Sequence, residues 1–237
     1  MTELIQKTEE YVKSLTLNEA TGHDWQHTQR VTAMALRLAK VEPDPVNEEL
    51  ITLACLLHDV KDYKLSGDEL AGPKAAQDWL NGQHADQKLI DHVVEIISTM
   101  SFKGQVHRPM SSREGMIVQD ADRLDAVGAI GIARAFAFGG AHGREIVNPE
   151  IPYRNELSET DYKNKALPTT SLNHFYEKLF KLDGHYHTLM ANEIGHQRHE
   201  FMKAYVKELL DECDMSEVLC DKRHNPTAQY HIIKNLL

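Results

Sequence analysis

The chain has 237 residues, of which 41% are hydrophobic and 26% are charged, and its formal net charge is -10. This is enough apolar material for a sizeable core, whereas the excess of acid argues against nonspecific binding to nucleic acid or to a membrane surface. The three cysteines suggest neither a disulfide framework nor a zinc knuckle, and no signal peptide or membrane-spanning apolar run is found. We therefore expect a cytoplasmic protein without a membrane or nucleic-acid partner.

Apolar residues recur at helical spacing along most of the chain. Helices are predicted over residues 2–16, 23–41, 47–60, 86–102, 112–137, 171–183 and 186–212. Pro43 and Pro45 end the second of these, and Gly72-Pro73 interrupts a further helical segment before Trp79. No repeat, low-complexity linker or alternating β pattern of useful length is found. The sequence therefore predicts an all-α fold, most simply one domain over 1–237, with a weakly patterned tail at 213–237.

Residues 139–169 have an irregular pattern that contains GGAHG, Asn148-Pro149 and Ile151-Pro152. A loop of about 30 residues is unusual inside a compact domain and is often functional. We expect this segment to cover a substrate, with Tyr153 and Arg154 available for base stacking.

Four polar residues interrupt apolar helix faces. His27 shares a face with Val31, and His58 continues the buried face that precedes it, with Asp59 beside it. Asp122 lies on the apolar face of a third predicted helix. Taken singly, each is more typical of a hydrogen-bonded core histidine, a chance dipeptide or a surface aspartate. Together, two imidazoles and two carboxylates form a ligand set that suits a divalent metal ion.

The joint pattern resembles the HD-domain superfamily of metal-dependent phosphohydrolases. The resemblance is carried by His27 in GHDWQHTQRV, by His58-Asp59 in LLHDVKD and by Asp122 in DADRLDAVGA, in the family's order H…HD…D. The chain is also similar to the small bacterial HD hydrolases that act on nucleotides, through GAIGIARAF and HFYEKL, and the match covers about residues 20–205. The resemblance implies a helical HD-type bundle in which His27, His58, Asp59 and Asp122 hold a metal.

The choice among three nearby aspartates rests partly on this resemblance. Asp120 and Asp122 are separated by about 200° around a helix, so both cannot easily reach one ion. The ADRL segment resembles the family's last ligand at Asp122, which leaves Asp120 and Asp125 as supporting or surface residues.

One divalent ion is expected. Two-metal members of the family carry extra histidines between the HD pair and the last aspartate, and His84, His92 and His107 lie in that interval. Their spacing does not compel a second metal. Mn²⁺ is the first choice from the ligand set and the resemblance, with Mg²⁺, Co²⁺, Ni²⁺, Fe²⁺ and Zn²⁺ as options.

Two residues are candidates for proton transfer. Asp62 lies one helical turn after His58 and resembles the acidic residue of the family's HDxxE members, although it could equally be a surface aspartate. His23 lies one turn before His27 and could equally be a surface histidine at a helix N-terminus.

Phosphate groups need positive charge beyond the metal. The candidate substrate-binding cations, each of which could instead be a solvated surface residue, are Arg30, Lys61, Arg144 and Lys178.

The resemblance implies a metal-dependent phosphohydrolase, most simply a (deoxy)nucleoside triphosphate pyrophosphohydrolase that uses metal-bound water. The residues themselves indicate only a phosphate ester or anhydride as substrate. One alternative is an HD-type nucleotidase or a cyclic or alarmone nucleotide phosphodiesterase, although Asp62-Tyr63 replaces the Glu-Asp pair of alarmone hydrolases. Another is a non-catalytic domain that binds metal and nucleotide and regulates a partner.

Two further properties are expected or left open. The oligomeric state is open, with a homodimer as one option. Loss of the ion should leave Asp59 and Asp122 repelling one another, so the metal-free protein should be less stable above about pH 5.

Overall fold

The computed structural model describes residues 2–16, 22–60, 70–100, 109–154, 167–213 and 215. These residues form helices, turns and irregular segments without a β-strand, so the all-α prediction is confirmed. No described helix is by itself long and apolar enough to cross a membrane, and only the bent pair 113–125 with 128–141 meets that test of length and composition together. The chain divides into two compact units, each described separately below. The assignment of residues 1–237 to one domain stays a prediction.

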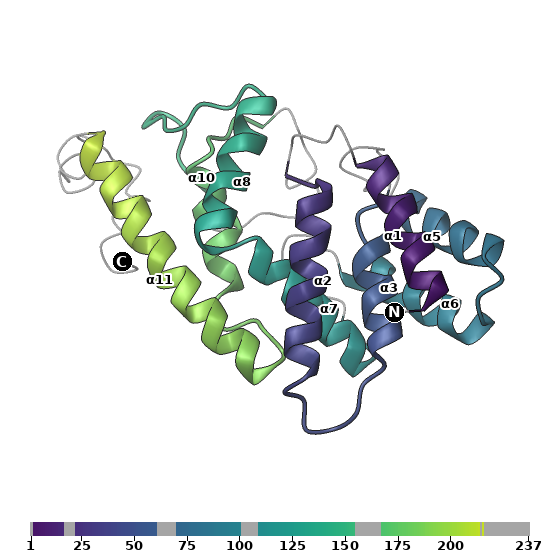
Figure 1. Cartoon of the computed structure of the whole chain (residues 1–237). Coiled ribbons are helices and arrows are strands. Elements are labelled where there is room, and N and C mark those ends of the chain that lie inside the picture. The colour runs from purple at the N-terminus through teal and green to yellow at the C-terminus, as the bar shows by residue number, and fades with distance from the viewer. Residues whose placement is uncertain are drawn as a thin grey trace. The chain divides into compact units, whose positions relative to one another are not determined.

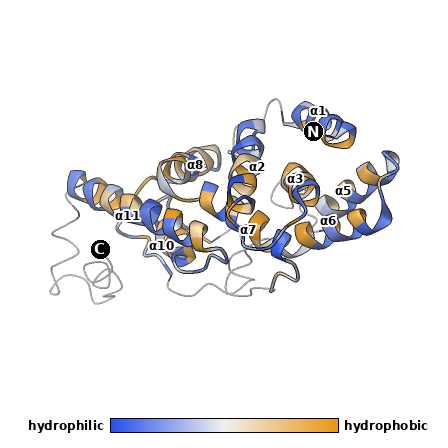
Figure 2. Cartoon of the chain, turned by 60° about the horizontal axis from the view of Figure 1, so that its bottom comes forward, coloured by the Kyte–Doolittle hydropathy of each residue, from blue (hydrophilic) through white to orange (hydrophobic). Residues whose placement is uncertain are grey.

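Unit 1 contains residues Met1–Asp125 and Tyr186–Ala191. Its helices are α1 (Glu3–Leu15), α2 (Trp25–Ala39), α3 (Glu48–Leu57), α5 (Ala71–Gly82), α6 (Gln87–Met100) and α7 (Arg113–Asp125). Helix α3 packs against α1, α2, α6 and α7 (Figure 1). Every residue of α3 from 50 to 57 is buried, and Figure 2 colours this helix mainly hydrophobic. The apolar helix that precedes the His-Asp pair is therefore the centre of the unit 1 core.

Side-chain caps fix where the site-bearing helices begin. The Asp24 carboxylate accepts a hydrogen bond of 2.8 Å from the backbone N–H of His27, and Asn47 caps α3 through the N–H of Leu50. These caps satisfy amide groups that the first helical turn leaves without a partner. Capping therefore places His27 in the first turn of α2, while His58 follows the last residue of α3.

The continuity of two helical segments differs from the prediction. The helix predicted over 112–137 is interrupted, because α7 ends at Asp125, Val127 is extended and Gly128 has a φ of +78°. That left-handed conformation is readily available only to glycine. By contrast, Gly72-Pro73 does not interrupt a helix, since both residues lie in the first turn of α5, where a missing N–H costs little.

Unit 2 contains Ala126–His185 and Asn192–Leu237. Its described elements are α8 (Gly128–Ala141), α10 (Asn173–Glu177), the 3₁₀ helix η1 (Leu179–Leu182) and residues 192–212 of α11 (Leu189–Glu212). Phe175, which is fully buried, contacts the rings of Phe136, Phe180 and Tyr205 and so centres an aromatic core. In place of the single helix predicted over 171–183, the structure has the two short helical segments α10 and η1. The tail beyond 215 lies outside the described residues.

The irregular segment begins later than predicted, because α8 continues to Ala141. Its described parts, 142–154 and 167–172, contain no helix, and residues 155–166 lie outside the described residues. The two parts are joined by a hydrogen bond of 2.9 Å from the Ser171 N–H to the Glu145 carbonyl. The Tyr153 ring is 2% exposed and stacks on Tyr176, with ring centres 4.6 Å apart. Tyr153 therefore fills the interior of unit 2, which argues against the base-stacking role that the sequence suggested.

Candidate metal centre

The four predicted ligand side chains converge in unit 1. The Asp59 Oδ2 atom lies 3.2 Å from His27 Nε2 and 3.4 Å from His58 Nε2. Asp122 Oδ1 lies 3.7 Å from His27 Nε2 and 3.8 Å from His58 Nε2. The ligands come from α2, from the turn after α3 and from α7, which pack against one another. The structure therefore assembles the H…HD…D residues at one point.

The Nδ1 atom of each ligand histidine already forms a hydrogen bond within the protein. His27 Nδ1 lies 2.7 Å from Asp125 Oδ2, and His58 Nδ1 lies 2.7 Å from the carbonyl oxygen of Cys55. Since a carboxylate and a carbonyl can only accept, each Nδ1 donates its hydrogen. In each neutral imidazole, the Nε2 lone pair is then the one that faces the site.

The facing nitrogens require a shared positive charge. The two Nε2 atoms lie 3.2 Å apart, so they cannot both carry a hydrogen along that line, and without a cation their lone pairs would oppose one another. Burial disfavours the charged form of His58, but Asp59 and Asp122 outweigh burial and raise its pKa to about 9. Although burial opposes it, the charge of His58 and the hydrogen bond from His23 hold the pKa of Asp59 well below its usual range. In the metal-free protein a proton on His58 thus supplies the charge.

The donor geometry also fits a divalent ion. With ligand bonds of about 2.1 Å, neighbouring ligand atoms lie about 3.0 Å apart at right angles and about 3.4 Å apart at the tetrahedral angle. The Nε2 atoms of His27 and His58 lie 3.2 Å apart, and they lie 3.2 to 3.8 Å from the nearest oxygens of Asp59 and Asp122, which is close to these values. Burial raises the pKa of the Cys55 thiol, so this nearby cysteine stays protonated and offers its carbonyl rather than a thiolate.

Asp120 turns away from this centre, as the helical geometry predicted. Its buried carboxylate accepts hydrogen bonds from the backbone N–H groups of His187 and Thr188, at 2.8 to 3.0 Å. It therefore anchors the segment before α11 and is not a ligand.

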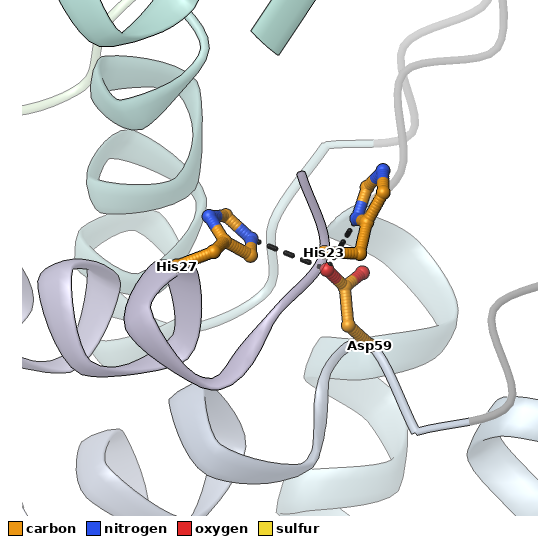
Figure 3. A group of neighbouring side chains, drawn as sticks. All are labelled: His23, His27 and Asp59. Carbon is orange, nitrogen blue, oxygen red and sulfur yellow. Dashed lines mark hydrogen bonds and ion pairs between the residues drawn. The ribbon is translucent and has the colours of Figure 1, made fainter. Parts of the chain in front are cut away.

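His23 approaches the centre from the start of the α2 region. Its Nδ1 lies 2.6 Å from Asp59 Oδ2, the same oxygen that faces His27, as Figure 3 shows. An ionised Asp59 can only accept, so His23 donates from Nδ1 and keeps its Nε2 lone pair available. The His23 side chain is 14% exposed. Two groups, His23–His27–Asp59 and His27–His58–Asp122, could each hold an ion, but they share His27, so they indicate one metal centre.

The predicted substrate contacts fall in different parts of the chain. Arg30 is in unit 1 and forms an ion pair with Asp125, with Nε 2.7 Å from Oδ1. Arg144 and Lys178 belong to unit 2, where the Arg144 guanidinium lies over the Phe138 ring, 5.2 Å from its centre. Lys61 and the catalytic candidate Asp62 lie outside the described residues. The substrate-binding and catalytic roles of these residues stay predictions.

Asp125 is the supporting residue that the sequence identified least well. Its carboxylate contacts both His27 and Arg30, although it could only be assigned as a supporting or surface residue beforehand. The available signal was the helical spacing, because Asp125 lies three residues after Asp122 and Arg30 three residues after His27.

Known proteins resemble this chain along most of its length. The family model of the HD domain matches residues 24–127. YpgQ of Bacillus subtilis (strain 168) is 35% identical over 201 residues, which are 84% of this chain and 88% of that protein. A crystal structure of YpgQ in complex with ADP superposes with a TM-score of 0.67 at 31% identity, covering 88% of this chain and 97% of that one.

Two further solved structures agree with this fold. A crystal structure of a Lactobacillus plantarum protein superposes with a TM-score of 0.80 and 36% identity, covering 90% of this chain and 98% of that one. An HD-superfamily hydrolase from Bacillus thuringiensis superposes with a TM-score of 0.66 and 41% identity, covering 89% and 96%. The structural similarity therefore covers about nine tenths of the chain.

Proposed function

The chain belongs to the HD-domain superfamily, and from this premise we propose that it is a metal-dependent phosphohydrolase that acts on nucleotides. The observation that carries the proposal is the convergence of His27, His58, Asp59 and Asp122 around one point, with both histidine Nδ1 atoms already engaged. These four residues would hold the ion. Mn²⁺ is our first choice.

The ion would supply Lewis-acid chemistry, since a divalent metal lowers the pKa of water and polarises a phosphoryl oxygen. The protein's own contribution begins with His23. Asp59 fixes the His23 ring so that Nδ1 is the donor, which leaves Nε2 as a proton acceptor at a partly exposed position. We assign His23 to accept a proton from attacking water or to return one to the leaving group.

The nucleotide part of the proposal has separate support. YpgQ, a relative over most of the chain, was crystallised with ADP. The resemblance to nucleotide-hydrolysing HD proteins favours attack on a phosphoanhydride of a (deoxy)nucleoside triphosphate, with release of pyrophosphate. A nucleotidase or a nucleotide phosphodiesterase uses the same metal centre, so the products distinguish these activities.

The test is product analysis on a panel of nucleoside mono-, di- and triphosphates and cyclic nucleotides, with Mn²⁺ or with EDTA. We expect metal-dependent release of pyrophosphate and a monophosphate, which Asp59→Ala abolishes. The matched control is Asp78→Asn, an exposed aspartate that forms an ion pair with Lys74 on the same helix, α5, and it should retain full activity. If the wild-type protein binds Mn²⁺ and nucleotide without forming any product, the enzyme proposal is wrong and a regulatory domain replaces it.

A further inference from the structure

The Asp125 carboxylate connects a metal-ligand histidine to an arginine. Its Oδ2 atom accepts from His27 Nδ1 at 2.7 Å and from Arg30 Nη2 at 3.1 Å, while Oδ1 accepts from Arg30 Nε at 2.7 Å. The Asp125 side chain is 7% exposed and the His27 side chain is fully buried. We call these three residues the Arg30–Asp125–His27 relay.

The relay joins the two helices that carry His27 and Asp122. Arg30 lies one turn after His27 on α2, and Asp125 lies one turn after Asp122 at the end of α7. The planar guanidinium donates one hydrogen bond to each carboxylate oxygen, and this pairing fixes the orientation of the carboxylate plane as well as its position. Arg30 on α2 therefore orients Asp125, and Asp125 in turn orients His27, which also lies on α2.

The charge on Asp125 determines which nitrogen of His27 carries hydrogen. An arginine at hydrogen-bonding distance favours the ionised carboxylate, and an ionised carboxylate can only accept. His27 must then donate from Nδ1, so its Nε2 lone pair points at Asp59 and Asp122. Carboxylate partners of this kind orient ligand histidines and raise their basicity in metalloproteins.

We propose that Arg30 and Asp125 are positioning residues that hold His27 ready to bind the metal ion, and that Arg30 acts on the metal centre rather than on substrate phosphate. This inference rests on the metal centre of the proposed function, and it replaces the phosphate-binding role that the sequence suggested for Arg30. The Arg30 side chain is 37% exposed, so a phosphate could approach it. The two roles are therefore separated by measurement of metal affinity without substrate.

The chain offers a matched control pair. Arg113, the first residue of α7, forms an ion pair with Glu42, just after α2, and the two side chains are 39% and 6% exposed. The Arg30–Asp125 pair has exposures of 37% and 7%. Both pairs thus connect α7 to the α2 region with similar burial. Among the described residues, however, Arg113 donates to Glu42, Met116 and His187, none of which is a predicted metal ligand. A merely structural role of Arg30 would make the two arginines equivalent.

The experiment titrates metal-stripped, full-length protein with Mn²⁺ in a calorimeter, without nucleotide. Asp125→Asn and Arg30→Gln should each weaken Mn²⁺ binding, by about 10- to 100-fold for the aspartate and by a smaller factor for the arginine. Arg113→Gln should bind Mn²⁺ within about twofold of wild type. Arg30→Lys keeps the charge but loses the paired hydrogen bonds, so its affinity should fall between wild type and Arg30→Gln.

Failure of this inference and failure of the proposed function give different results. If Arg30→Gln keeps wild-type Mn²⁺ affinity and instead raises KM for the nucleotide, Arg30 contacts substrate and the inference is overturned. If wild type binds no divalent ion, the metal centre fails, and with it the proposed function. Should the variants not fold, ¹⁵N spectra of the metal-free wild type still decide the matter, because the relay requires His27 to carry its hydrogen on Nδ1. A His27 that is protonated only on Nε2 would refute it.

Discussion

Binding of the metal ion should compete with one proton on His58. The carboxylates of Asp59 and Asp122 outweigh the effect of burial and raise the pKa of His58 in the metal-free protein to about 9. At pH 7, two units below this pKa, protonated His58 outnumbers neutral His58 by about a hundredfold. Removal of the proton therefore costs the incoming ion about 2.7 kcal/mol. A histidine with the ordinary pKa of about 6.5 would cost only about 0.2 kcal/mol at that pH.

The assay is calorimetric titration of metal-stripped protein with Mn²⁺ from about pH 7 to pH 8.5. The dissociation constant should fall about tenfold per pH unit, because one proton leaves as one ion binds. Parallel titrations in buffers of different ionisation enthalpy should show release of about one proton. In metal-free protein, ¹⁵N spectra should show His58 titrating near pH 9, and Asp122→Asn should lower that pKa by removing one of the two carboxylates.

Asp78→Asn again serves as the control, since this exposed residue on α5 should leave the His58 titration unchanged. The reasoning would be refuted by an Mn²⁺ affinity that does not change between about pH 7 and pH 8.5, or by a metal-free His58 that titrates at an ordinary pKa near 6.5.

The proton on His58 also makes the stability of the metal-free protein depend on pH. Because the folded-state pKa of His58 is raised from 6.5 to about 9, its stabilisation is complete below about pH 6.5 and is lost as pH rises through 9. Urea unfolding of metal-free protein should therefore show that the free energy of unfolding falls by about 3 kcal/mol between about pH 6.5 and pH 9, and a flat profile would contradict this. The carboxylate repulsion expected from the sequence would instead lower it above about pH 5. Gly131→Ala should destabilise unit 2 by about 1 to 3 kcal/mol, because the new Cβ would lie 2.2 Å from the Ala126 carbonyl oxygen. Gly140→Ala on the same helix meets nothing within 4 Å and should be neutral or stabilising in the same thermal unfolding assay, so equal losses in both variants would exclude the steric explanation. Burial raises the pKa of Glu177, so its stabilisation is present below about pH 4.5 and is lost as pH rises through the raised pKa. Glu177→Gln should consequently gain melting temperature relative to wild type between about pH 4 and pH 7, and a difference that stays constant with pH would disprove this.

Much of the fold could be predicted from the sequence because helix formation depends on neighbours a few residues apart. The apolar spacing of residues 47–60 predicts α3, which the structure places over Glu48–Leu57 with its core face fully buried. The metal ligands could be predicted from the sequence for the same reason, since His27, His58 and Asp122 each interrupt a local apolar helix face.

Backbone breaks were predicted less well, because they depend on conformation rather than on polarity. The apolar pattern continues through residues 112–137, yet Gly128 takes a left-handed conformation and separates α7 from α8. The irregular segment after α8 was recognised from its composition. The stacking of Tyr153 on Tyr176, which buries the ring, depends on packing across 23 residues of chain.

Tertiary structure alone decided how the metal centre is supported. The sequence by itself determined which residue types could bind a divalent ion, because donor atoms and their place on a helix face are local properties. It did not determine that Asp125 Oδ2 meets His27 Nδ1 across 98 residues, or that Arg30 holds the same carboxylate. Such pairs depend on the relative position and rotation of α2 and α7, which the packing of both helices around the buried α3 fixes.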